Sequence, residues 1–237
     1  MEEMHNTKAR DYNPIDYCNP LWVIEEDFVS EVLGKCNAIW EYSGNPERAH
    51  VELSGGKCSN GFFNCLKALK FINLNEIFAY HLATKIRKEI GDVPINWVIG
   101  SPMAGITYSH AVARHLGADI HMFTEKDPKV KGRMLWEREV IPEGDSVLQI
   151  EELITTSKTL NNVQAGVERD NPYPVNWISV IGTFVHRPDK LPVTHYGDRK
   201  VISLFEREVW AVEYPCKLCE EGSPRYRPKT NWEELTG

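Results

Sequence analysis

The chain of 237 residues contains no long hydrophobic run. No apolar stretch approaches the roughly 20 residues that a membrane-spanning helix needs. The first residues, Met1 to Lys8, include no apolar segment of the kind found in a secretory signal. Positive charge is also in deficit, since the formal net charge is −7. The sequence therefore disfavours a membrane partner and a nucleic-acid partner, and we expect a cytoplasmic protein.

Cysteine is sparse, with six residues in the whole chain, and this number is typical of reduced intracellular thiols rather than of a disulfide framework. One pair, Cys216 and Cys219, has the C-x-x-C spacing that forms half of many zinc sites. The remaining cysteines provide no second C-x-x-C, so the sequence gives a zinc site little support. A redox motif is weaker still, because thioredoxin-like pairs begin a helix after a strand. The role of the pair stays open.

The sequence also lacks internal repeats and low-complexity segments, and its length fits one α/β domain with a small appendage. Apolar spacing predicts alternating strands and helices, with strands at 95–99, 119–124, 146–150 and 176–185 and helices at 74–90, 104–116 and 158–168. Asn73 is the expected cap of the first of these helices. Such alternation predicts right-handed βαβ units and a mostly parallel sheet flanked by helices.

Four segments are expected along the chain. Residues 1–48 form an N-terminal arm and helix, and residues 49–70 supply the strands of a small hood. Residues 71–210 form the core, and residues 211–237 form a tail that carries the C-x-x-C. Two short strands are expected in the hood, at 50–53 and 62–66, with Gly55-Gly56 making the turn.

The strongest functional signal runs from Ser146 to Thr159. An apolar strand leads into two adjacent carboxylates, Glu151 and Glu152, and a turn rich in hydroxyl groups precedes a helix. Acids directly after a buried strand are costly unless they are used. A helix N-terminus with hydroxyl groups suits a phosphate, and the carboxylates suit ribose hydroxyls or Mg²⁺. The turn residues are Thr155, Thr156, Ser157, Lys158 and Thr159.

A second candidate site follows the strand at 95–99. It reads Gly100-Ser101-Pro102-Met103-Ala104-Gly105. Small residues at a strand end let an anion approach the backbone in front of a helix N-terminus. By itself this turn is a weak signal, because many α/β turns look similar.

Residues 125–145 are long, charged and weakly periodic, as functional or disordered loops are. Five cations lie among residues 125–138: Lys126, Lys129, Lys131, Arg133 and Arg138. In an acidic protein, such a loop suits closure over a polyanion, whose charge it would stabilise. A solvated hairpin is the other interpretation.

The segment 52–63 joins a glycine turn to Lys57 and the aromatic pair Phe62 and Phe63. Aromatic rings can cover a flat heterocycle while turn backbone groups bind its edges. The alternative, that both rings belong to the core, has at least equal weight.

These motifs resemble the type I phosphoribosyltransferases, and among them the orotate phosphoribosyltransferase family. The segment 151–159 resembles the motif that binds 5-phosphoribosyl-1-pyrophosphate (PRPP), with Glu152 where Asp is usual and Ser157 where Gly is usual. The segments 50–59 and 216–224 are similar to the family's entry motif and to a tail found in one of its branches. The segments 99–106, 123–127 and 131–134 look like its pyrophosphate loop and catalytic loop. In V-H-R-P (185–188), Arg187 matches the arginine that contacts the carboxylate of the base.

The resemblance implies an α/β fold of the type I phosphoribosyltransferase class, with a mostly parallel twisted sheet and a small hood. It implies transfer of a phosphoribosyl group from Mg²⁺-bound PRPP to orotate, in a homodimer whose loop cations act in the neighbouring subunit. The catalytic residues would be Lys126, Lys129, Lys131 and Arg133. PRPP would be bound by Glu151, Glu152, Thr155, Thr156, Ser157, Lys158, Thr159, Ser101, Met103, Ala104 and Gly105. The base would be bound by Arg187, Thr155, Phe62, Phe63 and Lys57. No residue is assigned as a direct metal ligand.

Two alternatives remain at this point. One is a phosphoribosyltransferase for uracil, a purine or nicotinate, although an arginine at 187 is best used on an anionic base. The other is a non-catalytic regulator that binds PRPP on the same fold. We expect catalysis to survive the differences at Glu152, Ser157 and His186.

Overall fold

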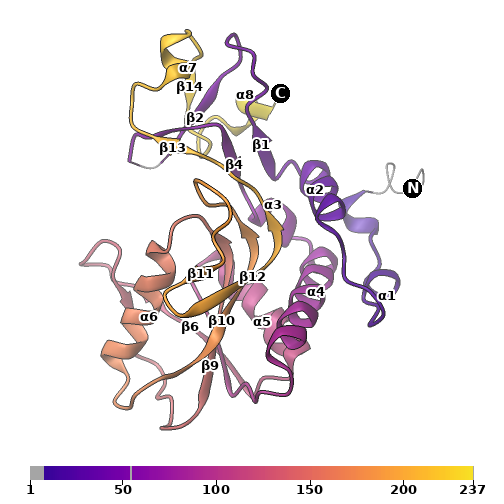
Figure 1. The fold of residues 1–237 in the computed structure, drawn as a ribbon, viewed down its shortest axis with the longest axis vertical. Helices are drawn as coiled ribbons and strands as arrows, with labels where there is room; N and C mark the ends of the chain where they lie inside the picture. Colours follow the sequence, from indigo (N-terminus) through magenta and orange to yellow (C-terminus); the bar gives the residue numbers. More distant parts are fainter. Residues whose placement is uncertain (1–7, 54, 237) are drawn as a thin grey trace.

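The computed structural model describes residues 8–53 and 55–236. An α/β core carries a smaller hood, which lies at the top of the view in Figure 1. Residues 1–7 of the expected arm and Ser54 of the entry motif lie outside the described residues. No described helix combines the length and the apolar character needed to cross a membrane.

The core is built on a six-stranded sheet in the order β11-β12-β10-β9-β5-β6. Five of its strands are parallel, and the short edge strand β11 (His195–Tyr196) is antiparallel. The parallel strands are β5 (Trp97–Gly100), β6 (Ile120–Phe123), β9 (Ser146–Ile154), β10 (Asn176–His186) and β12 (Arg199–Glu206). This arrangement confirms the predicted mostly parallel sheet.

Helices cover both faces of the sheet (Figure 1). The helices α2 (Glu26–Lys35), α4 (Ile72–Ile90) and α5 (Ala104–Leu116) share one apolar cluster with the sheet, and α6 (Lys158–Asp170) packs on the other face. Successive side chains of a strand point to opposite faces. Val98 of β5 accordingly joins the first cluster, whereas Trp97 and Ile99 join the cluster of α6. A strand buried on both faces reads as a continuous apolar run, which is why β5 was predictable.

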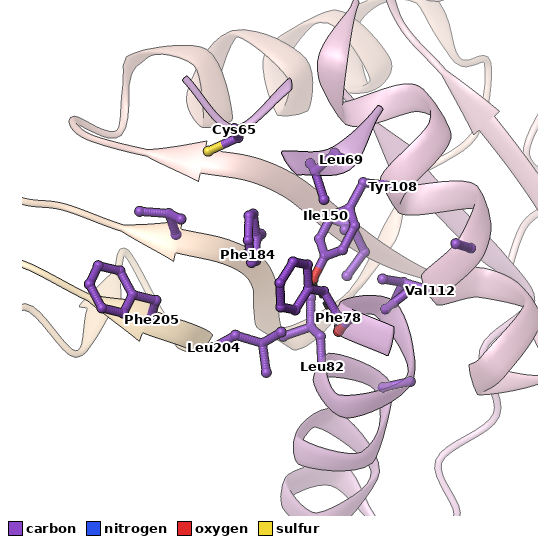
Figure 2. Packing of buried hydrophobic residues seen from close by; sticks show 14 of the residues in the cluster. Cys65, Leu69, Phe78, Leu82, Tyr108, Val112, Ile150, Phe184, Leu204 and Phe205 are labelled. Atoms are coloured by element: carbon purple, nitrogen blue, oxygen red, sulfur yellow. Dashed lines mark hydrogen bonds between the residues drawn. The ribbon is translucent and has the colours of Figure 1, made fainter. Parts of the chain in front are cut away.

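The larger cluster is dense with aromatic rings. Figure 2 shows Phe78 of α4, Tyr108 of α5 and Phe184 of β10 packed together. The rings of Phe78 and Phe184 stack with their centroids 4.6 Å apart, and all three side chains are fully buried. Burying each such side chain contributes about 2 kcal/mol or more, so this contact holds α4 and α5 against the sheet.

The helices begin and end close to their predicted positions, with one wrong cap. α5 matches the prediction and ends at Gly117, whose φ of 66° is the left-handed conformation that glycine favours. α4 begins at Ile72, and Phe71 occupies the cap position, so Asn73 is not the cap. The Asn73 side chain instead donates hydrogen bonds to the carbonyls of Ala9 and Tyr12. It therefore fastens the N-terminal segment, which includes η2 (Ala9–Asp11) and α1 (Pro14–Tyr17), to the core.

The largest correction concerns β9, which was expected to end at Ile150 and in fact continues to Ile154. Glu151 and Glu152 therefore lie within the strand rather than directly after it. Its pairing with β10 explains the extension, since Glu151 lies opposite Thr183 and Ile154 opposite His186. The hydrophobic pattern stops at the first carboxylate, so periodicity alone could not reveal that the last residues of β9 still pair with β10.

The hood joins the two ends of the chain. A four-stranded sheet in the order β13-β3-β2-β14 combines β2 (His50–Glu52) and β3 (Cys58–Ser59) with β13 (Ala211–Val212) and β14 (Arg225–Tyr226). Gly55 and Gly56, both with positive φ, form the turn between β2 and β3. The helix α7 (Lys217–Glu220) precedes β14, and α8 (Trp232–Thr236) packs Trp232 against Trp40 and Val51.

A second, smaller ladder connects the hood to the core. β1 (Ile39–Glu41) pairs with β4 (Gly61–Phe63) in antiparallel register. The strand expected at 62–66 ends early because the helix α3 (Leu66–Leu69) begins there. The expected segments 49–70 and 211–237 thus contribute strands to one hood sheet.

Candidate functional site

Many of the predicted site residues gather where the carboxyl ends of the parallel strands face the hood. A main cavity of about 980 Å³ lies between the two, with a smaller cavity of about 200 Å³ beside it. Phe62, Pro228 and Lys229 line both. In doubly wound sheets, ligands bind at this edge. Another cavity, of about 520 Å³, lies at the opposite edge near Ser146 and Asn176 and contains none of the predicted residues.

Glu151 lies beneath the cavities rather than in their walls. Its side chain is only 1% exposed and accepts hydrogen bonds from the Ser101 hydroxyl and, at 2.9 Å, from Gln149 Nε2. Burial, and secondly the neighbouring charge of Glu152, raise the pKa of Glu151 to about 8. The carboxyl is therefore protonated over most of the neutral pH range. Arg199 supports this layer by donating to Gln149 Oε1 at 3.1 Å.

Glu152 points to the other face of β9 and lines the smaller cavity with Ala104. Burial raises the pKa of its carboxyl, and the positive charge of Lys126 opposes that rise. An added Cβ on Gly105 would lie 3.1 Å from Glu152 Oε2 and 3.0 Å from Ser101 Oγ. Glycine at 105 therefore makes room for the carboxylate. Of the two acids, Glu152 lines one of these cavities and Glu151 lines neither.

The hydroxyl turn lies at the start of α6, as predicted. Thr155, Thr156 and Lys158 line the main cavity. Ser157 occupies the cap position of α6, and within the described structure its side chain makes no capping hydrogen bond to the helix backbone. The first N–H groups of α6 are therefore left for another acceptor, which is the arrangement that binds phosphate.

The turn after β5 brings part of the predicted pyrophosphate loop into contact with the acids. Ser101 is buried against Glu151, Ala104 lines the smaller cavity, and Met103 is exposed. At Gly100, an added Cβ would lie 2.1 Å from Ser109 Oγ, so this position excludes larger residues. Glycines at 100 and 105 thus allow the close packing of α5 that places the turn below the hood.

Arg187 is a buried cation in the wall of the main cavity. Its side chain is 7% exposed and lines the cavity next to Asp189. Burial lowers the pKa of the guanidinium, although nearby Asp189 opposes the change. Among the described residues, Arg187 Nε has no hydrogen-bond partner. A buried, incompletely paired cation in a cavity wall favours an anionic ligand. The adjacent His186 is directed elsewhere, since it bonds Glu206 at 3.0 Å and Tyr196 at 3.2 Å.

Phe62 and Phe63 differ in their surroundings, since Phe62 lies at the cavities and Phe63 belongs mainly to the core. Phe62 lines both cavities and packs on Trp232 with 5.7 Å between ring centroids. Phe63 touches the smaller cavity, but its ring is 2% exposed and packs on Phe205 in the core. Lys57 lines the main cavity and forms an ion pair of 3.0 Å with Glu213.

The basic loop is more ordered than its sequence indicates. β7 (Glu125–Lys126) and β8 (Met134–Leu135) pair as a hairpin, and Met134 is buried against α6. This packing requires Gly166, where an added Cβ would approach Met134 O to 2.7 Å. In the described chain, the two cavities have no lining residue from the loop cations Lys126, Lys129, Lys131 and Arg133. Lys126 is nevertheless near enough for its charge to lower the pKa of Glu152, so only Lys129, Lys131 and Arg133 are kept away from both cavities of their own chain.

Several lining residues were missed from the sequence. Arg227, Pro228 and Lys229 line the main cavity from the C-terminal tail, and Glu52 lines it from β2. Glu52 pairs with Arg227 at 2.7 Å and with Arg225 at 3.3 Å, and these pairs lower its pKa. Strand periodicity gave no signal for these residues, because β14 ends at Tyr226 and the consecutive residues Arg227, Pro228 and Lys229 of the following turn all line the cavity.

Comparison with known proteins gives consistent matches. The chain is 31% identical over 206 residues to an orotate phosphoribosyltransferase of Thermoanaerobacter sp. (strain X514), covering 86% of this chain and 97% of the relative. It is 28% identical over 209 residues to an orotate phosphoribosyltransferase of Caldanaerobacter subterraneus subsp. tengcongensis, covering 86% and 97%. The solved orotate phosphoribosyltransferase structure from Aeropyrum pernix matches with a TM-score of 0.51 and 17% identity, covering 75% of this chain and 93% of the other. No model of a protein family matches the chain.

Proposed function

Because this chain belongs to the orotate phosphoribosyltransferase family, we propose that it transfers the 5-phosphoribosyl group of PRPP to orotate. The products are orotidine 5′-monophosphate and pyrophosphate, as in pyrimidine biosynthesis. The predicted fold class, the α/β fold of type I phosphoribosyltransferases, is confirmed by the match to a solved member of the family.

The observation that carries the substrate assignment is the buried guanidinium of Arg187. It lies in the wall of the main cavity, and its Nε lacks a partner among the described residues. Orotate carries a carboxylate, whereas uracil and the purine bases carry none. A charge-assisted hydrogen bond from Arg187 to that carboxylate would complete the pairing of the arginine and select the anionic base.

The rest of the cavity suits PRPP. In this proposal, the hydroxyls of Thr155 and Thr156 and the N–H groups that open α6 hold the 5′-phosphate, and Lys158 adds a positive charge. Glu152 is placed to bind a ribose hydroxyl. We assign Glu151 a supporting role toward the same sugar through Ser101, which its carboxyl contacts.

Catalysis in this site would rest on positioning and electrostatics. The bond between ribose C1 and the pyrophosphate oxygen breaks, the bond from C1 to the ring nitrogen of orotate forms, and the proton of that nitrogen passes to the departing pyrophosphate or to solvent. The transition state is oxocarbenium-like at C1, and no described side chain is needed as a covalent nucleophile. Cations that neutralise the departing pyrophosphate would lower the barrier.

Mg²⁺, the homodimer and the cytoplasmic location belong to the proposal. Mg²⁺ arrives bound to PRPP, and the carboxylate of Glu152 and the turn hydroxyls are oxygen donors of the kind that it accepts. The exposed cations Lys129, Lys131 and Arg133 line neither cavity of their own chain, which supports a role in a neighbouring subunit's site.

Turnover of orotate tests the activity directly. When purified protein is incubated with PRPP, Mg²⁺ and orotate, the absorbance of orotate should fall. One pyrophosphate should be released for each orotate consumed. Turnover with uracil, hypoxanthine or nicotinate but not with orotate would overturn the substrate and keep the reaction class. PRPP binding without pyrophosphate release from any base would instead favour the regulator.

Substitution of Arg187 tests the observation behind the assignment. Arg187→Ala should raise the KM for orotate about 10- to 100-fold, the value of a lost hydrogen bond to a charged group, and change the KM for PRPP little. The matched control is Arg114→Ala, which removes an arginine of α5 that pairs with Glu76 at 2.8 Å, away from both cavities. An unchanged KM for orotate in the Arg187 variant would remove the basis for selecting an anionic base.

A further inference from the structure

Four side chains of the types that commonly bind metals lie close together in the hood, outside the proposed active site. The cluster consists of His50, Cys58, Cys216 and Cys219, and their potential ligand atoms all lie within 4.8 Å of one another. His50 and Cys58 come from the paired strands β2 and β3, and the other two come from the C-x-x-C at α7. The sequence separates the two pairs by more than half of the chain, so no second C-x-x-C could reveal them.

Four of the six distances within the cluster match a tetrahedral site, and none of the six exceeds 4.8 Å. Cys219 Sγ lies 3.7 Å from both Cys58 Sγ and Cys216 Sγ. His50 Nε2 lies 3.6 Å from Cys216 Sγ and 3.3 Å from Cys219 Sγ. A tetrahedral zinc with bonds of about 2.3 Å to sulfur and 2.0 Å to nitrogen places its sulfurs about 3.8 Å apart and its sulfur and nitrogen about 3.5 Å apart. The sulfurs are too far apart for a disulfide, and all three cysteines are free.

The surroundings orient His50 as a ligand. The Ser223 hydroxyl donates to the carbonyl of Arg48 at 2.6 Å, so its lone pairs remain for the N–H of His50 Nδ1, 2.9 Å away. With the proton on Nδ1, the lone pair of Nε2 faces the three sulfurs. Metal-bound histidines typically have their second nitrogen fixed by such a hydrogen bond.

Burial and charge around the cluster also suit a metal. His50, Cys58 and Cys216 are buried, and Cys219 is partly buried. Three thiolates around one Zn²⁺ leave one net negative charge, and the guanidinium of Arg225 lies against the Cys58 thiol, where it would offset that charge. A Cys₃His set with all positions taken by protein is typical of structural zinc rather than catalytic zinc.

We propose that this cluster binds one structural Zn²⁺, which joins the C-terminal tail to the β2–β3 hairpin. Both connected segments line the main cavity, through Gly55, Gly56 and Lys57 on one side and Arg227, Pro228 and Lys229 on the other. The metal therefore stabilises this wall of the main cavity without lining the cavity itself. The inference rests on the cluster alone and not on the proposed reaction.

Metal analysis of the intact protein tests the site. Protein produced in zinc-supplied medium and purified without chelator should contain about one zinc per chain, measured by inductively coupled plasma mass spectrometry. Cys219→Ser should reduce the content below about one tenth, since the remaining ligands bind zinc more weakly. The matched control Cys36→Ser replaces a half-buried cysteine outside the cluster and should retain the full content.

Two measurements on the wild-type protein test the site even if the Cys219→Ser variant fails to fold. Refilling the chelated wild-type protein with Co²⁺ should produce the thiolate charge-transfer and visible bands of a tetrahedral Co²⁺ site. In the zinc-loaded native protein, three fewer thiols should react with a thiol reagent than after chelation. Zinc-free protein with every thiol of the cluster reactive, a disulfide between Cys216 and Cys219, or stoichiometric iron in place of zinc would each overturn the proposal.

Discussion

At the scale of single residues, the buried carboxyl of Glu151 makes stability depend on pH in a predictable direction. Burial raises its pKa from 4.5 to about 8, and the charge of Glu152 adds to the rise. The folded protein therefore binds this proton more tightly than the unfolded chain does. The resulting stability is complete below about pH 4.5 and is lost as the pH rises through 8.

Glu151→Gln isolates that contribution. The glutamine keeps a similar shape without a charge, so the free energy of unfolding of the wild type should fall relative to the variant between about pH 5 and pH 8, by up to about 1.4 kcal/mol per pH unit. Urea denaturation across this range measures the difference. The control Glu137→Gln changes an exposed carboxyl. Parallel pH profiles for wild type and Glu151→Gln would contradict the raised pKa.

Gly105 tests the placement of Glu152. In Gly105→Ala, the new Cβ would lie 3.1 Å from Glu152 Oε2 and 3.0 Å from Ser101 Oγ, so the carboxylate must shift away. We expect the KM for PRPP to rise several-fold, by about 1 kcal/mol of lost binding, while the melting temperature changes little. Steady-state kinetics at saturating orotate measure this effect. Gly34→Ala is the control, because its Cβ would meet open space, and an unchanged KM in Gly105→Ala would place the ribose elsewhere.

At the scale of elements, the β7–β8 hairpin separates a rigid base from an exposed tip. Met134 and Trp136 anchor its second strand and the segment that follows in the cluster under α6. Asp127 organises the tip by accepting from the N–H groups of Lys129 and Val130 at 2.7 Å and 3.2 Å, and by pairing with Arg133 at 3.5 Å. The cations are thus presented outward on a short, ordered projection.

Mixing two variants, each impaired at orotate concentrations below the wild-type KM, tests whether these cations act in a second subunit. Lys131→Ala lacks a loop cation and Arg187→Ala lacks the base contact, so each homodimer should be impaired at both sites. In a two-fold dimer that exchanges subunits, the mixed species has one intact site, and an equal mixture should recover roughly a quarter of wild-type activity. Assays after co-refolding measure the recovery.

The control for this experiment is a mixture of two variants within the cavity wall of one chain. Thr155→Ala with Arg187→Ala changes residues that line the same main cavity. If both residues act in the site of their own subunit, each site of the mixed dimer carries one of the two substitutions. The mixture then has no intact site and is no more active than the separate variants. Equal failure of the Lys131 mixture would mean that the loop acts within its own chain or that the protein is not a dimer.

At the scale of the whole molecule, the C-terminal tail completes the hood and the cavity together. Trp232 of α8 packs with Trp40 and Val51, donates its indole N–H to the carbonyl of Asn37 at 3.1 Å, and supports the ring of Phe62. The tail is therefore structural as well as part of the proposed base site.

Trp232→Ala should reveal both roles. Removing the ring should lower the free energy of unfolding by about 3 kcal/mol and raise the KM for orotate, because Phe62 loses its support. Thermal unfolding and steady-state kinetics measure the two effects. Trp22→Ala removes an indole that is 40% exposed and should change both values little. A destabilised variant with an unaltered KM would mean that Phe62 does not contact the base.

The sequence by itself determined the alternation of strands and helices, the location of the hydroxyl turn and the family. These features depend on local periodicity and on short contiguous motifs, and Gly117 at the end of α5 is one example. Only the tertiary structure decided that β9 continues through both acids, that Glu151 is buried while Glu152 reaches a cavity, and that Arg227 to Lys229 join the wall. It also brought His50 and Cys58 to the C-x-x-C pair. Strand pairing and burial depend on residues far apart in the chain, so neither the environment of a carboxyl nor the ligands of a metal can be deduced from spacing alone.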